Sequence, residues 1–122
     1  MAVDEKIVMR VRDALAETAG VTEKRMFGGV CFLLNGNMLC GVEKTTLMLR
    51  VGKDAYEETL SLPHCRVMDF TGKPFVGYVN VDPDGFSDKR SLKRWLARAE
   101  SFVAALPPKA KKPSSRLKKK RV

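Results

Sequence analysis

The dipeptide Asn35-Gly36 lies between two apolar runs and constrains the fold of this chain more than any other feature. Both residues tolerate the positive φ that a two-residue type I′ turn requires, so the sequence predicts a β-hairpin over residues 26–43. A two-residue loop also sets the register of the strands, and in that register Cys31 faces Cys40. We therefore expect the two thiols to lie side by side.

The rest of the sequence alternates between helical and strand patterns. Apolar periodicity and turn residues predict helices over residues 4–19, 53–62 and 87–106 and further strands over residues 47–51, 66–70 and 75–81. Strands joined by short turns, with helices at the ends, are typical of the α+β class. We expect an antiparallel sheet of about five strands, an N-terminal helix, a C-terminal helix and a short middle helix.

The predicted hairpin carries apolar residues on both faces, including Leu33 and Met38 on one and Phe32 and Leu34 on the other. A sheet with helices on only one face would expose an apolar surface to water. Either the terminal helices lie on opposite faces of the hairpin, or another molecule covers one face. The second alternative predicts a protein partner or a homodimer.

Positive charge is concentrated at the C-terminal end of the chain. Residues 107–122 carry eight cations and no acid, and removing these eight charges from the net charge of +9 leaves +1 for residues 1–106. We expect a folded domain over residues 1–106 and a disordered tail that contacts nucleic acid phosphates without reading bases, or that only aids solubility. The tail is too poor in apolar residues for a membrane contact. Its cations are Lys109, Lys111, Lys112, Arg116, Lys118, Lys119, Lys120 and Arg121.

The pair Gly28-Gly29 does not have the context of a nucleotide-binding loop, because such a loop lies between a strand and a helix. In this sequence a helical pattern precedes the glycines and a strand pattern follows them, so a bend in the chain is the better interpretation. Phe27 is expected in the core. Arg25 is either a solvated charge or an anchor for a partner's carboxylate or phosphate. Arg25, Phe27, Gly28 and Gly29 are therefore candidate interaction residues.

The cysteines and the single histidine give little support for catalysis. Cys31 and Cys40 form either a redox pair or two small buried hydrophobes. Three cysteines without metal-ligand spacing, and no apolar leader, favour a cytoplasmic protein without a metal or cofactor. No catalytic triad or paired carboxylates accompany His64, so we predict that the chain is not an enzyme. A cleft near Arg25, His64 and Tyr78 is the enzymatic alternative.

Several segments of the sequence resemble the N-terminal domain of the TfoX/Sxy family, whose members are bacterial regulators of natural competence. They are Arg25-Met-Phe-Gly-Gly29, Gly36, Leu47-Met-Leu-Arg-Val51, Gly72-Lys-Pro74, Phe75-Val-Gly-Tyr-Val79 and Trp95. The resemblance covers about residues 3–106, and it implies a stand-alone domain because longer members carry a second, C-terminal domain. It also implies a non-enzymatic, protein-interacting co-regulator of transcription, associated in the family with the cyclic-AMP receptor protein at promoters.

Overall fold

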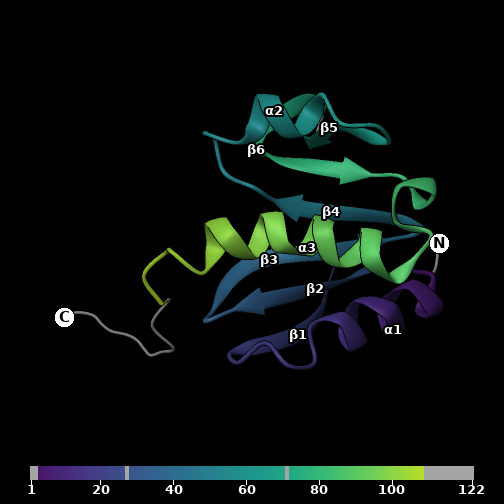
Figure 1. Cartoon of the computed structure of the whole chain (residues 1–122), viewed down its shortest axis with the longest axis vertical. Coiled ribbons are helices and arrows are strands. Elements are labelled where there is room, and N and C mark those ends of the chain that lie inside the picture. Colours follow the sequence, from purple (N-terminus) through teal and green to yellow (C-terminus); the bar gives the residue numbers. More distant parts are fainter. Residues whose placement is uncertain (1–2, 27, 71, 109–122) are drawn as a thin grey trace.

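A computed structural model describes residues 3–26, 28–70 and 72–108, which form three helices, a short 3-10 turn and one antiparallel sheet (Figure 1). The sheet has six strands in the order β1-β2-β3-β4-β6-β5. The predicted α+β class is confirmed, with one strand more than the expected five or so. The elements are α1 (Glu5–Ala14), β1 (Val21–Met26), β2 (Gly29–Leu34), β3 (Asn37–Glu43), β4 (Thr46–Arg50), α2 (Tyr56–Leu60), β5 (Cys65–Phe70), β6 (Lys73–Val81), η1 (Pro83–Phe86) and α3 (Lys89–Val103).

The additional strand is β1, which the sequence pattern did not indicate. Its residues, Val-Thr-Glu-Lys-Arg-Met, are exposed or half-buried because β1 is an edge strand, so the alternation of apolar residues is missing. The first helix accordingly ends at Ala14 and not at residue 19, and Gly20 with φ +86° leads into β1. Gly28, with φ +77°, lies between β1 and β2. It bends the chain between two strands, and not between a helix and the sheet as predicted.

The predicted hairpin is present, but its register changes after the first two residue pairs. A β-bulge between Phe32 and Leu33 places Phe32 opposite Cys40, and Cys31 opposite Gly41. Cys40 is fully buried, whereas Cys31 is half-buried. Neighbouring positions on a strand point to opposite faces, so the prediction that Cys31 faces Cys40 is wrong. The extra residue in β3 therefore places the side chains of Cys31 and Cys40 on opposite faces of the sheet.

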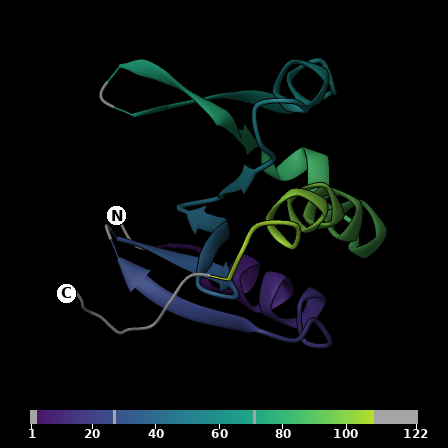
Figure 2. The same cartoon turned by 90° about the vertical axis from the view of Figure 1, so that its left-hand side faces the viewer.

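The helices cover one face of the sheet, where they enclose the core (Figure 2). The helix α3 packs on β3 and β4 and also contacts α1, so the two terminal helices lie on the same side. The alternative in which they enclose the hairpin from opposite faces is wrong. The Asp88 side chain caps α3 by accepting a hydrogen bond from the Ser91 N–H. The buried residues of this helix are Leu92, Trp95, Leu96, Ala99 and Val103.

Candidate functional site

The face of the sheet that points away from the helices holds an apolar groove of about 300 Å³. Side chains or backbone from all six strands line it. Four of the six methionines of the chain are among them, together with a half-buried cysteine and two aromatic rings. Among the described residues, no helix covers this face (Figure 2). We call this surface the open groove, and its principal side chains are Met26, Cys31, Met38, Met48, Met68, Phe75 and Tyr78.

Gly41 forms the floor of the open groove. It pairs with Cys31 on one side and with Met48 on the other. A Cβ atom at residue 41 would lie 3.3 Å from Met48 Cε and 3.6 Å from Cys31 Sγ. Because glycine has no side chain, these two sulfur-containing side chains approach each other over β3 and leave a depression between the strands.

Two stacked aromatic rings line another part of the groove. The ring centroids of Phe75 and Tyr78 are 4.5 Å apart, and the ring planes are 15° from parallel. The guanidinium of Arg50 lies 5.7 Å from the centroid of the Tyr78 ring, within the range of a cation–π interaction. Phe75 and Val76 of β6 are 44% and 52% accessible to solvent. The apolar surface therefore extends from the groove onto the β5–β6 hairpin.

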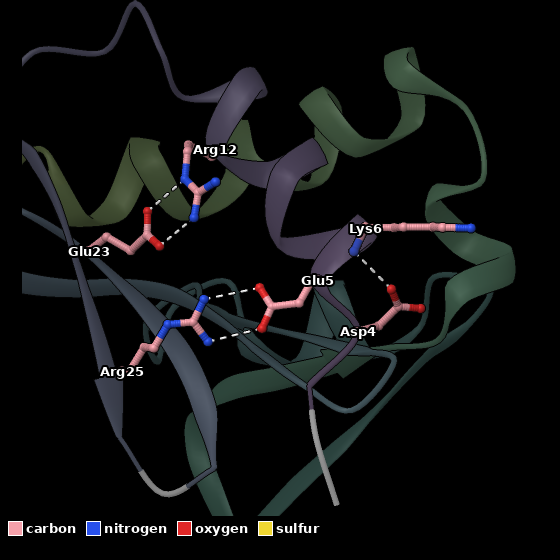
Figure 3. Close-up of polar contacts among 6 residues, drawn as sticks. All are labelled: Asp4, Glu5, Lys6, Arg12, Glu23 and Arg25. Atoms are coloured by element: carbon pink, nitrogen blue, oxygen red, sulfur yellow. Dashed lines mark hydrogen bonds and ion pairs between the residues drawn. The ribbon is translucent and has the colours of Figure 1, made fainter.

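Arg25 lies outside the open groove and is bound to the first helix. Its guanidinium donates two hydrogen bonds of 3.0 Å to the carboxylate of Glu5 (Figure 3). Arg12 and Glu23 form a second bidentate pair between α1 and β1, at 2.9 and 2.6 Å. The arginines lower the pKa of both carboxyl groups through these hydrogen bonds. In this structure Arg25 joins β1 to α1.

The two candidate glycines have structural roles. A Cβ atom at Gly29 would lie 2.6 Å from the carbonyl oxygen of Val42, so only glycine allows the close approach of β2 to β3 there. Gly28 supplies a positive φ in the turn. Phe27 and the eight tail cations lie outside the described residues.

The three cysteines are free thiols, and none is prepared to act as a nucleophile. Burial raises the pKa of Cys31, and burial raises the pKa of Cys40 much further. Burial raises the pKa of Cys65 to about 11. A nucleophilic cysteine requires a lowered pKa, so the local environments oppose thiolate chemistry at neutral pH.

The residues of the proposed enzymatic cleft are not brought together. Tyr78 lines the open groove, whereas His64 lines a separate depression beside α3 and Arg25 pairs with Glu5. Within the described residues, no three histidine, cysteine or acidic side chains gather where they could hold a metal ion. The helices in this part of the chain are also too short or too polar to cross a membrane.

Sequence reasoning identified apolar residues on both faces of the hairpin but did not identify the groove. The alternation in β4 was a usable signal, since Met48 and Arg50 alternate with the buried residues Leu47 and Leu49. The contribution of Met26 required knowledge of β1, and that of Gly41 required knowledge of the bulge.

Comparison with known families gives one match. The family model described as the TfoX N-terminal domain matches residues 13–103. No curated protein and no solved structure matches the chain significantly.

Proposed function

We propose that this chain, which belongs to the TfoX N-terminal domain family, is a non-enzymatic regulatory domain. It binds another protein through the open groove. The observation that carries the proposal is the concave, methionine-rich face that none of the described helices covers. Exposed apolar patches of this kind are typical of interaction sites.

The chemistry of the groove favours an amphipathic helix as the segment that binds there. Methionine side chains are flexible and polarizable, so they adapt to the apolar side chains of a partner. An amphipathic helix inserts one apolar ridge into such a groove and leaves its polar residues at the rim. Lys24, which is exposed and pairs with the groove residue Cys31, offers a positive charge to acidic residues on that helix.

The family suggests the biological setting. We infer a role in bacterial transcriptional regulation in the cytoplasm, with the cyclic-AMP receptor protein or RNA polymerase as the partner and natural competence as the pathway.

A second candidate function is non-specific binding of nucleic acid by the tail. The eight cations of residues 109–121 favour this function.

The experiment compares two methionine variants of the full chain. Met48→Glu places a charge in the groove, and Met9→Glu makes the same change on α1, where Met9 is 56% exposed and outside the groove. Binding to the purified cyclic-AMP receptor protein and to RNA polymerase is measured by calorimetry. We expect Met48→Glu to weaken binding at least tenfold and Met9→Glu to leave it unchanged.

Equal affinities of the two variants would contradict the groove as the binding site. Absence of binding by the unmodified chain to either protein would contradict the assignment to these transcription proteins. Circular dichroism is the check that both variants fold, and Met38→Glu provides a second groove variant at a half-buried position.

A further inference from the structure

The helix α3 presents a strongly cationic face to solvent, on the other side of the sheet from the open groove. Residues 89–98 contain five cations and no acid. Leu92, Trp95, Leu96 and Ala99 bury the opposite side of the helix. We call this surface the α3 cationic face, and its residues are Lys89, Arg90, Lys93, Arg94 and Arg98.

These cations follow the helix in two parallel rows. Arg90, Arg94 and Arg98 are spaced four residues apart, and Lys89 and Lys93 form the adjacent row. Residues at this spacing are neighbours on a helix surface, so each row places like charges next to one another. A helix that only had to cover the core would gain nothing from this arrangement.

Two further features make the arrangement unfavourable for the isolated domain. Lys89 and Arg90 lie in the first turn of α3, where the helix dipole disfavours positive charge. The ion pairs found among the described residues involve none of the five cations. Asp88, which precedes Lys89 in the chain, uses its carboxylate to accept hydrogen bonds from Ser91 at the helix N-terminus. Local rules are most often broken in this way at functional sites.

Arg94 lines two depressions of the surface. One is shallow and is lined by Lys89, Arg90, Lys93, Arg94 and Ala97. A second depression, of about 260 Å³, is lined by His64, Ser91, Arg94 and Arg98 among others. Arg94 borders both, so anionic groups seated in the two depressions would share its guanidinium.

We propose that the α3 cationic face binds the sugar-phosphate backbone of duplex DNA. Successive cations in one row are about 6 Å apart along the axis, from the rise of 1.5 Å per residue, so the face presents a line of charges to a line of phosphates. It offers no exposed aromatic ring for stacking on single-stranded bases, because Trp95 is buried and donates a hydrogen bond to the Gly85 carbonyl. Such contacts position a protein on DNA without reading its sequence.

The experiment measures binding of the full chain to a 25-base-pair duplex by fluorescence anisotropy over a series of salt concentrations. The test variant is Arg90→Gln/Lys93→Gln/Arg94→Gln, which neutralises three exposed positions of the face. The charge-matched control is Lys6→Gln/Lys44→Gln/Lys53→Gln, which removes three exposed cations elsewhere. A tail variant, Lys118→Gln/Lys119→Gln/Lys120→Gln, has the same net charge as both.

We expect the α3 variant to make the slope of log K against log salt shallower by about 2 to 3, or ~0.9 for each lost contact. We also expect its Kd at low salt to rise more than tenfold, and the control to change both quantities much less.

The proposal is overturned if the α3 variant and the control behave alike, if only the tail variant weakens binding, or if the unmodified chain does not bind the duplex at low salt. If the triple variant does not fold, Arg94→Gln is expected to change the slope by ~0.9. Met48→Glu should retain DNA binding, so failure of this proposal is distinguishable from failure of the groove proposal.

Discussion

The Cε atom of Met48 lies 3.3 Å from the position that a Cβ of Gly41 would occupy, so the open groove depends on the absence of a side chain at residue 41. Gly41 occupies this position because a bulge in the β2–β3 hairpin places it opposite Cys31. The bulge therefore sets which residue of β2 faces Gly41 across the floor of the groove. The same bulge directs Cys40 into the core.

The register of the hairpin predicts different reactivities of the thiols. We expect Cys40 to resist a maleimide in the native protein, because it is fully buried and burial strongly raises its pKa. Burial raises the pKa of Cys65 to about 11, so its labelling rate should increase about tenfold per pH unit between pH 7 and 10. Mass spectrometry after mild oxidation should detect no bond between Cys31 and Cys40. Formation of that disulfide in folded protein would contradict the observed register.

Trp95 is predicted to contribute to stability through both packing and a hydrogen bond. Its Nε1 donates to the carbonyl oxygen of Gly85 over 2.8 Å. Trp95→Phe removes the donor and leaves the carbonyl without this partner, which should lower the free energy of unfolding by about 1–3 kcal/mol. Urea denaturation measures the change, with Met9→Ala as the exposed control. A loss of equal size in both variants would show that the hydrogen bond contributes little.

The carboxylates that bind arginines predict a loss of stability in acid. The folded-state pKa of Glu5 and Glu23 is lowered below the ordinary value of 4.5 by hydrogen bonds from Arg25 and Arg12. Their stabilising contribution is therefore present above pH 4.5 and is lost as the pH falls through the lowered values. We expect Glu5→Gln/Glu23→Gln to lose less stability than the unmodified chain between pH 5 and pH 2. The difference should shrink in 1 M salt, because both pairs are exposed. Parallel pH profiles would contradict this assignment.

Glu100 is predicted to destabilise the folded chain at neutral pH, whereas Glu5 and Glu23 stabilise it. Burial raises its pKa above 4.5, so folding penalises the charged carboxylate at neutral pH. The penalty disappears as the pH falls below the unfolded value, since both states then bind the proton. Glu100→Gln should raise Tm at pH 7 by no more than about 4 °C and leave it unchanged at pH 3. Calorimetric scans at the two pH values test this, and a lower Tm at pH 7 would contradict it.

Much of the fold was predictable because it rests on strong local signals. The Asn35-Gly36 turn, the cap of α1 at Asp4 and the apolar stripe of α3 each appear where their residue types require them. The limits of α1 and the presence of β1 were not predictable, because an edge strand of charged residues lacks the alternation that identifies buried strands.

The candidate site was less predictable than the fold, because it arises from long-range geometry. The apolar residues on both faces of the hairpin left two alternatives open, and only the packing of α3 against α1 on the same side of the sheet decides between them. Arg25 was an appropriate candidate by residue type, but its partner Glu5 is 20 residues away and becomes a neighbour only when β1 pairs with β2. The cationic rows of α3 were visible in the sequence. Their significance depends on the structure, because the ion pairs of the described residues lie elsewhere.

The most direct test of the groove is methyl NMR of the full chain labelled at its methionine methyl groups. Four of the six methionines lie in the open groove, and the exposed Met9 on α1 is an internal control. During titration with the cyclic-AMP receptor protein or RNA polymerase, we predict that the resonances of Met26, Met38, Met48 and Met68 shift or broaden while that of Met9 stays unchanged. A titration in which the partner binds and Met9 responds while the four groove methyl groups do not would contradict the account.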